Sequence, residues 1–538
     1  MGRLRAPGLA TLQGMPGSEP DEGVTLAELL AAFSLATDLG MGQPMEHVLR
    51  SWRIAARLGD QVGLSEDERA SLYFIAILAW VGCVADTPEV ARWFGDDIAF
   101  RADSYQTELA GLPGLTFMLG HAGAGGGGLH RLRLASTLVA TGGRAIQRGM
   151  WSHCLSTSTM AEGLGLGPQV CDPLRQFFTR WDGKGVPGGV GGQAIATSVR
   201  LFHVADVIEV AHRTRGLDAA VDVAQARRGR HFDPRVVDAF CKMAPQVLEG
   251  RVDEPDCYDL IAADPVLQRC LSGEELDSAL EAVADFTDLR SAWRAGHSRG
   301  VAALAGQAAD LAGLSAADVA AVRRAGLLHD VGMHGVPATI LDKPGPLTAT
   351  ESERLRLHAY YTERVLARPT ALARIGAIAA LTNERLDGSG YHRGLSGSAL
   401  SAPVRILAAA DAYRAMTEPR PYRPALSPGQ ASAALREDVR LGRLAPQAVD
   451  AVLTAAGQYR GRRRTGPAGL TPREVEVLVL IARGASTRQV ARALGISPKT
   501  AGTHIERIYT KTGASTRSTS TLFALHHGLL DTLQPLDS

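Results

Sequence analysis

Three histidines and two aspartates in the second half of the chain are of the residue types that bind a divalent metal ion. His329 and Asp330 are adjacent at the end of the apolar segment AAVRRAGLLHD, so one helix end offers an imidazole and a carboxylate together. Another imidazole lies upstream and two more donors lie downstream, which gives the set His297, His329, Asp330, His358 and Asp411. Imidazoles mixed with carboxylates suit an intermediate cation such as Fe or Mn better than Ca or structural Zn. The sequence therefore predicts a divalent metal site carried mostly by helices.

The segments around these residues follow the order of a known family. HSRGVAALA, LLHDVGM, ILDKPGPLT, ERLDGSGYH and ADAYRAMTEPRPYRPALS, within residues 280–440, resemble the HD phosphohydrolase superfamily and its HD-GYP branch. The resemblance implies a helical, metal-dependent phosphohydrolase, of a kind that often hydrolyses cyclic di-GMP. It implies a primary metal held by His297, His329, Asp330 and Asp411, a second-metal ligand at His358, catalytic roles for His329 and Asp330, and substrate contacts from Lys343, Gly390 and Tyr391.

The same stretch departs from the HD-GYP pattern at the second metal. Thr382 and Asn383 stand where the pattern has a His-His pair, Met333 replaces the lysine of HDIGK, and His392 replaces the proline of GYP. A two-metal phosphodiesterase needs ions about 3.5–4 Å apart to clamp the attacking and leaving oxygens. Without the two imidazoles we expect one divalent metal in this part of the chain, Fe or Mn, and slow or absent cleavage of cyclic di-GMP.

The C-terminal end carries a basic charge and the start signals of four short helices. From residue 459 onward, twelve Arg or Lys residues face five acidic ones, a net charge of +7 on a chain whose total is +1. Such a basic tail is typical of a nucleic-acid partner. Capping boxes stand at 471–474 and 486–489, and a tight turn at 495–497 leads into a third helix. Two short helices joined in this way present a recognition helix to the DNA major groove.

This tail is similar to the LuxR-type DNA-binding domain over LTPREVEVLVLIARGASTRQVARALGISPKTAGTHIERIYTKTG. The resemblance implies that the third helix enters the groove and that the fourth makes dimer contacts. Double-stranded DNA is therefore the expected partner, with a homodimer on DNA. The candidate DNA-contacting residues are Lys499, Thr500, Thr503, His504, Arg507 and Lys511.

The rest of the chain repeats itself. Asp38 and His47 match Asp288 and His297 at an offset of 250, whereas Asp206 matches Asp411 at an offset of 205. The difference places 45 extra residues in the first copy, including the glycine-rich stretch 122–128, where we expect a mobile surface loop.

The first copy has lost most of the metal ligands. Ala79 and Trp80 occupy the positions of His329 and Asp330, and Phe177-Phe178 replaces the His-His pair. Only His47, His153 and Asp206 of the set remain, and Trp80 would fill the space between them. We expect no metal there, and a degenerate domain kept for packing, dimerisation or ligand sensing.

Length and composition frame these assignments. A chain of 538 residues is too long for one core, and its hydrophobic fraction of 45% lets most of it fold. The six cysteines form no CxxC pair, and we find neither a leader nor an apolar run of eighteen residues, so we expect a cytoplasmic protein with no membrane contact. The predicted fold class is all-α: a disordered start (1–22), two tandem HD-type domains (23–255, with the Gly-rich insertion, and 256–460), a basic linker (461–469) and a four-helix LuxR-type domain (470–538).

Three functions are compatible with this organisation. The leading one is a one-component transcription regulator whose HD-type body senses a ligand and hydrolyses phosphoesters through one metal. The second is a phosphohydrolase, similar to cyclic di-GMP phosphodiesterases, with an accessory DNA-binding tail. The third is a pseudoenzyme that binds a nucleotide without cleaving it.

Overall fold

The computed structural model describes residues 23–141, 143–249, 255–458 and 467–530. Within these ranges the regular elements are α-helices and short 3-10 helices, with a few isolated β-bridges and no strand. The predicted all-α fold class is confirmed. The expected disordered start (1–22), most of the expected basic linker (461–466) and the end of the chain (531–538) lie outside the described residues.

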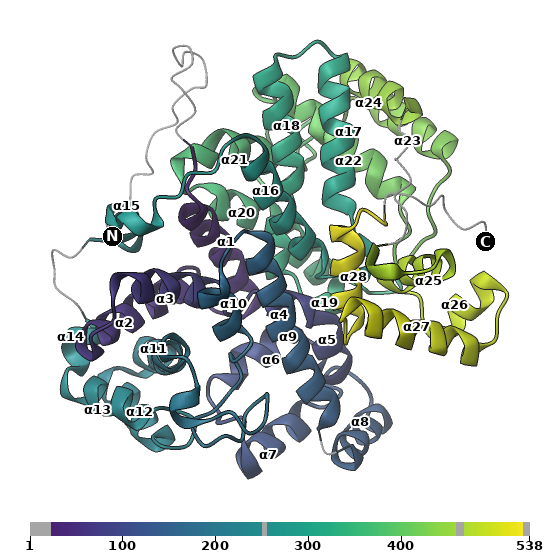
Figure 1. The fold of residues 1–538 in the computed structure, drawn as a ribbon. Coiled ribbons are helices and arrows are strands. Elements are labelled where there is room, and N and C mark those ends of the chain that lie inside the picture. The colour runs from purple at the N-terminus through teal and green to yellow at the C-terminus, as the bar shows by residue number, and fades with distance from the viewer. Residues whose placement is uncertain (1–22, 142, 250–254, 459–466, 531–538) are drawn as a thin grey trace.

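The helices of the two halves begin at positions that follow the sequence offsets (Figure 1). Adding 250 to the bounds of α3 gives those of α18, and adding 205 to the first residues of α9 and α11 gives those of α20 and α22. In the first half the helices are α1 (Leu26–Gly40), α2 (His47–Val62), α3 (Glu66–Leu78), α4 (Gly82–Ala85), α5 (Thr87–Phe94), α6 (Asp97–Ser104), α7 (Gly111–His121), α8 (Gly128–Ala140), α9 (Arg144–Gly163), α10 (Pro168–Leu174), α11 (Thr197–Arg215), α12 (Leu217–Arg227), α13 (Pro234–Lys242) and α14 (Ala244–Leu248). In the second half they are α15 (Cys257–Ala263), α16 (Gly273–Asp288), α17 (His297–Leu311), α18 (Ala316–Leu328), α19 (Ala338–Leu341), α20 (Ala349–Leu366), α21 (Ala373–Ala379), α22 (Ala402–Thr417), α23 (Pro428–Arg440) and α24 (Pro446–Gln458). The 3-10 helices are η1 (Gly192–Ala194), η2 (Pro265–Leu267), η3 (Ala292–Arg294), η4 (Val331–Gly335), η5 (Thr370–Leu372), η6 (Gly397–Ala399) and η7 (Pro467–Gly469).

The two halves share one hydrophobic core. Helix α1 is apolar on almost every side and packs both on α3 and α4 of its own half and on η4 and α20 of the other. Helix α16 does the reverse, because it packs on α17 and α18 and also on α4 and α9. A helix that is hydrophobic all round must be buried on all sides. The continuous core that results joins residues of both halves.

A buried arginine ties the halves together beside this core. Arg290 donates hydrogen bonds to Asp97 at 2.9 Å and to Thr87 at 3.1 Å, and it is fully buried. Asp97 in turn accepts the backbone N–H of Ala338, the first residue of α19, at 2.9 Å. Buried charges are tolerated when they are paired in this way. The pairing fixes α6 of the first half against the segment that follows η4 of the second.

The extra residues of the first half form four helices, α5 to α8, rather than a long loop. The glycine-rich stretch is the short turn between α7 and α8, and Gly128 already begins α8. Gly123 and Gly125 have φ values of 63° and 81°, which other residues adopt only with strain. Residues 125–128 are exposed, as expected of a surface turn.

The C-terminal domain has the four predicted helices, α25 (Pro472–Ala482), α26 (Thr487–Leu494), α27 (Pro498–Thr512) and α28 (Arg517–His526), drawn in yellow in Figure 1. Both predicted capping boxes are present, with Thr471 and Ser486 as the capping residues. Helix α28 also packs against α9 and α16, and its Leu522 is buried in the shared core of the body. The C-terminal domain is thus docked on both halves.

One helical stretch, Glu66–Ala85, is long and apolar enough by length and composition to cross a membrane. In its most apolar window, 72% of the residues are buried inside the protein. Core helices of this kind pass the same test, so the finding is weak evidence for a membrane span.

Candidate metal centre and DNA-binding surface

Three helices bring the predicted metal ligands to one place. His297 begins α17, His329 is the C-cap of α18 with Asp330 directly after it, and Asp411 lies within α22. These three helices pack on one another. Gly326 allows the close approach, because a Cβ there would lie 2.7 Å from the Cα of Ala302 on α17. Helix packing therefore determines where the four side chains meet.

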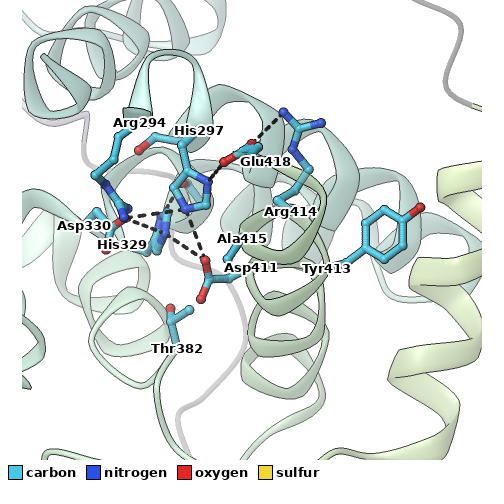
Figure 2. Close-up of polar contacts among 12 residues, drawn as sticks. Arg294, His297, His329, Asp330, Thr382, Asp411, Tyr413, Arg414, Ala415 and Glu418 are labelled. Atoms are coloured by element: carbon cyan, nitrogen blue, oxygen red, sulfur yellow. Dashed lines mark hydrogen bonds and ion pairs between the residues drawn. The ribbon is translucent and has the colours of Figure 1, made fainter. Parts of the chain in front are cut away.

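The donor atoms of these side chains converge (Figure 2). His297 Nε2 lies 3.2 Å from Asp411 Oδ1 and 3.7 Å from Asp330 Oδ2. His329 Nε2 lies 3.1 Å from Asp330 Oδ2 and 3.6 Å from Asp411 Oδ1. One donor atom each of His297, His329 and Asp411 falls within 4.8 Å of the others, as ligands of one ion would.

Both imidazoles present the nitrogen that a metal ion needs. The Nδ1 atom of His297 donates to Glu418 at 2.7 Å, and that of His329 donates to the carbonyl of Gly326 at 2.8 Å. The Nε2 lone pairs are therefore left facing the cluster, and His329 Nε2 is buried without a hydrogen bond from the described residues. A carboxylate or carbonyl behind the imidazole is the usual support of a histidine that binds metal. The residues present fit one divalent ion.

Two further charged residues complete this site. Burial opposes ionisation of Glu418, but His297 and Arg414 outweigh it and hold the pKa of the Glu418 carboxyl far below its usual range. Arg294, at the end of η3, forms an ion pair with Asp330 (Figure 2). The positive charge of Arg294 thus offsets part of the negative charge of the carboxylates.

The position expected for a second ion is occupied by a hydrogen-bond chain. His358 donates from Nδ1 to the carbonyl of Leu355 at 2.6 Å, so Nε2 holds the lone pair. That lone pair accepts the amide N–H of Asn383 at 3.0 Å, while Asn383 Oδ1 accepts the hydroxyl of Tyr391 at 3.0 Å. Burial lowers the pKa of His358 to about 4, so the ring is neutral near pH 7. Asn383 therefore donates to the His358 nitrogen that was expected to bind a second ion.

The three residues expected to contact substrate differ in their surroundings. The Tyr391 ring lies 6.0 Å from the His358 ring, beside the cluster. Gly390 is required by packing, because a Cβ there would lie 2.4 Å from Glu384 Cα. The Lys343 ammonium pairs with Glu351 at 2.6 Å. Tyr391 is thus the one of the three whose side chain the structure brings to the cluster.

The outer face of α27 is open in the C-terminal domain. Lys499, Thr500, Thr503 and Arg507 are exposed, whereas His504 is half-buried. Lys511 is also exposed, but it pairs with the buried Glu474 at 2.7 Å and so fastens α27 to the start of α25. Ala501 and Ile508 face the domain core. Of the six residues expected to contact DNA, four are exposed without being engaged in a described ion pair.

Comparisons with known proteins match both the part of the chain that holds the metal centre and the C-terminal domain. The HD-domain family model matches residues 281–447, and the model of bacterial regulatory proteins of the luxR family matches residues 468–524. The 3'3'-cGAMP-specific phosphodiesterase 3 of Vibrio cholerae is 30% identical over 428 residues, which is 77% of this chain and 91% of that protein. The chain belongs to the HD-domain phosphodiesterase family. It adds a LuxR-type DNA-binding domain at its C-terminal end.

Other members of the HD-domain phosphodiesterase family extend the likeness. A crystal structure of a cyclic GMP-AMP-specific phosphodiesterase from V. cholerae superposes with a TM-score of 0.57 at 27% identity, covering 81% of this chain and 99% of that one. A cyclic di-GMP phosphodiesterase of Thermotoga maritima is 39% identical over 161 residues, which is 29% of this chain and 43% of that protein. The V. cholerae phosphodiesterase 3 and the crystal structure each match more of this chain than the HD-domain segment, so the likeness reaches into the first half.

The first half of this family member satisfies its remaining ligands internally. The indole N–H of Trp80 donates to Asp206 at 3.0 Å, and His47 contacts Asp206 at 3.1 Å and Glu209 at 2.6 Å. Burial opposes the charge, but the two carboxylates raise the pKa of His47 from 6.5 to about 10. A protonated imidazole has no lone pair for a metal ion. Trp80 thus lies against Asp206, as the sequence led us to expect.

The first half also holds a donor cluster that sequence spacing did not reveal. Cys83, Asp86 and His153 place one donor atom each within 4.8 Å of the others. Asp86 accepts a hydrogen bond from Arg101 at 2.7 Å, and His153 donates from Nε2 to the carbonyl of Ala79 at 2.7 Å. The Arg101 charge beside the cluster repels a cation. We interpret the cluster as a packed polar network.

Sequence reasoning missed three residues at the metal centre. Glu418 follows Asp411 by seven residues and is the extended C-cap of α22, so helical spacing indicates only that it lies near the end of that helix. Asn383 was noted as a lost ligand but not as a donor to His358. Arg294 lies three residues before His297, and nothing in its spacing indicates its pairing with Asp330.

Proposed function

We propose that this chain is a DNA-binding transcription regulator whose second half hydrolyses a 3'3'-linked cyclic dinucleotide through one divalent ion. The observation that carries the proposal is the convergence of two supported imidazoles and two carboxylates on one point. The relatives named as cGAMP and cyclic di-GMP phosphodiesterases support the substrate class.

The proposed chemistry divides between the ion and the chain. A divalent ion held by His297, His329, Asp330 and Asp411 supplies Lewis-acid activation of water and of the scissile phosphate. Nitrogen and carboxylate donors without a thiolate favour Fe or Mn as that ion. The two imidazoles stay in the binding tautomer because their Nδ1 protons are donated to Glu418 and to Gly326.

Arg294 and Tyr391 are the chain's own groups for positioning the substrate. The guanidinium beside Asp330 matches a phosphate oxygen, with which Arg forms strong charge-assisted hydrogen bonds. The Tyr391 ring lies beside His358 at the same cluster and is able to stack on a base. Asn383 keeps the second position free of metal, so we expect slow turnover.

The test uses the full chain, first freed of metal by a chelator and then reloaded with Mn or Fe. We expect about one tightly bound ion per chain and slow linearisation of cGAMP, measured by chromatography. Cleavage of neither cyclic dinucleotide with one ion bound would contradict the hydrolase and favour the second candidate below.

The second candidate is a receptor that binds a cyclic dinucleotide without cleaving it. The ion pair of Arg294 with Asp330 and the bond from Asn383 to His358 support it, because both satisfy metal-site groups without metal. Binding of cGAMP by the chelated protein, measured calorimetrically, with no turnover after reloading, is the outcome that distinguishes this candidate.

For the C-terminal domain we propose binding of double-stranded DNA as a homodimer in the cytoplasm, with Lys499, Thr500, Thr503 and Arg507 at the interface. Removing one phosphate contact by Lys499→Ala should shallow the log–log salt slope of DNA binding by about 0.9. Arg436→Ala, on an exposed site of α23, is the matched control and should leave the slope unchanged. An unchanged slope in Lys499→Ala would remove this residue from the interface.

The repeat also suits a division of the chain into three domains. We propose that residues 23–255 and 256–460 are two copies of one HD-type unit, because helices in both begin at the positions given by the offsets. We further propose that residues 470–538 form the DNA-binding domain.

A further inference from the structure

A large cavity lies in the first half, between the inserted helices and the helices common to both halves. Its volume is about 620 Å³, within the range of about 300–1,000 Å³ that small-molecule sites occupy. Helices α7, α8 and α9 contribute lining residues to it, and so does α11. The wall that includes the inserted helices is apolar, with Leu115 and Met118 of α7, Leu138 of α8, and Ile146 and Met150 of α9.

The wall opposite is aromatic. Phe177, Phe178 and Phe202 line it together with Trp80, whose ring packs edge-on against Phe177 at 4.8 Å. By the offset of 205, Phe177 and Phe178 stand where the other half has Thr382 and Asn383. The metal-site position of the second half therefore corresponds to an apolar cavity here.

The polar groups of this cavity are mostly neutralised by one another. Asp206 already accepts hydrogen bonds from Trp80 and Tyr105 and pairs with His47. Arg180 pairs with Asp182 at 3.1 Å and with Glu108 at 2.8 Å. Two histidines at the same end, His203 and His231, have pKa values that burial lowers, so they are neutral near pH 7.

Arg227 and the exposed Lys184 are the exceptions among the described residues, and of the two only Arg227 is buried. Arg227 lines the cavity and is 8% exposed, and its hydrogen bond to the carbonyl of Tyr105 is long, at 3.5 Å. Its guanidinium otherwise lies over the Phe232 ring, 5.9 Å from the centroid, and it forms no ion pair with the described residues. A buried guanidinium without a carboxylate partner is costly, since buried charges need a partner. The cavity thus supplies an apolar body and one buried positive charge without an ion-pair partner among the described residues.

We propose that this cavity binds an apolar molecule that carries a single carboxylate, with the carboxylate on Arg227 and the chain or ring between the aromatic and inserted walls. A planar guanidinium pairs with a carboxylate through two parallel hydrogen bonds. The proposal goes beyond the function proposed above, because the cavity lies in the other half and its occupant is not a nucleotide. Its failure would leave metal binding and turnover in the second half untouched.

The first test measures binding to the full chain by calorimetry, with dodecanoate as the probe. Dodecanoate should bind about 10- to 100-fold more tightly than dodecanol, the value of a charge-assisted hydrogen bond. Dodecyltrimethylammonium, with the head-group charge reversed, should bind more weakly than dodecanol. Equal affinities for the three probes, or no binding of dodecanoate, would overturn the proposal.

Three variants locate the site. Arg227→Gln should reduce dodecanoate affinity to that of dodecanol and leave dodecanol binding unchanged. Arg228→Gln is the matched control, because the neighbouring Arg228 is 46% exposed and pairs with Asp238, and it should change neither affinity. Leu138→Trp should fill the cavity and weaken both probes.

Thermal unfolding of each variant checks that the fold is kept. Undiminished preference for dodecanoate in a folded Arg227→Gln, or full binding by a folded Leu138→Trp, would place the probe elsewhere and refute the cavity site.

Discussion

The two halves hold matching aspartates and histidines in opposite states. In the second half, His297 keeps one nitrogen on Glu418 and turns the other toward Asp411 and the metal centre. In the first half, His47 is held between Asp206 and Glu209, and both of its nitrogens are occupied. The two halves thus differ in how the charges around the matching histidines are paired.

The comparison also shows which side chains stand in the first half at the positions that match the metal centre of the second. Trp80 donates to Asp206 from the position that Asp330 holds in the second half, and the phenylalanines beside it open onto a cavity closed by inserted helices. Similarly placed helices thus carry a polar cluster in the second half and an apolar cavity in the first. The side chains at a few matching positions account for the difference.

The largest expected effect is a difference in metal binding between variants of the matching aspartates Asp411 and Asp206. Asp411→Asn should abolish metal binding, with a loss of affinity beyond the about 10- to 100-fold typical of outer-shell partners, because it removes a charged ligand. Asp206→Asn should leave the metal content of the full chain unchanged. Plasma mass spectrometry of both variants after reloading with Mn measures this, and a loss of metal in Asp206→Asn would contradict the contrast between the halves.

A smaller effect is expected from the carboxylate behind the imidazole. Glu418→Gln should weaken metal binding about 10- to 100-fold, since the amide supports His297 less well than a carboxylate does. Glu209→Gln, at the corresponding imidazole of the first half, is the control and should leave metal affinity unchanged. Competition with a chelating dye gives both affinities. Equal metal affinity in Glu418→Gln and the unmodified protein would show that Glu418 serves packing alone.

The second metal position provides a gain-of-function test. Replacing both Thr382 and Asn383 by His removes the Asn383 amide that donates to His358 and adds two imidazoles. We expect bound metal to rise from about one to about two ions per chain and cyclic dinucleotide cleavage to become several-fold faster. Thr382 is fully buried, so Asn383→His alone is the variant to use if the double replacement unfolds. Unchanged metal content in both folded variants would indicate that the lost His pair is not what limits the site.

Much of this comparison could be predicted from the sequence. The offsets of 250 and 205 match the helix starts of the two halves, and the capping residues at Thr471 and Ser486 marked helix starts correctly. These features depend on local chemistry and on order along the chain. The spacing of seven residues between Asp411 and Glu418 is likewise a feature of order along the chain.

Other features depend on how distant elements approach and could not be predicted. The glycine-rich stretch indicated a loop, yet its flanks fold into α7 and α8, whose residues line the cavity. The pairing of Arg294 with Asp330 and the buried charge of Arg227 depend on side-chain directions that spacing does not give. The docking of α28 on the body likewise depends on contacts between α9, α16 and a helix far along the chain.

The smallest predicted effect concerns the charge held on His47. Its folded-state pKa of about 10 lies above the unfolded value of 6.5, so its stabilising contribution is full below pH 6.5 and is lost as pH rises toward 10. We expect the melting temperature to fall across pH 7.5–10 by about 1–2 °C for each kcal/mol lost, because the unfolding entropy of a chain of 538 residues is large. The half-buried Cys257, whose pKa burial raises to about 11, contributes a loss of the same sign, so the raw slope is not diagnostic. The difference between the unmodified protein and His47→Gln isolates the imidazolium, because the cysteines are common to both. Calorimetric melts should give a shallower pH dependence for His47→Gln, and parallel curves for the two proteins would show that His47 is neutral and still has a lone pair for a ligand.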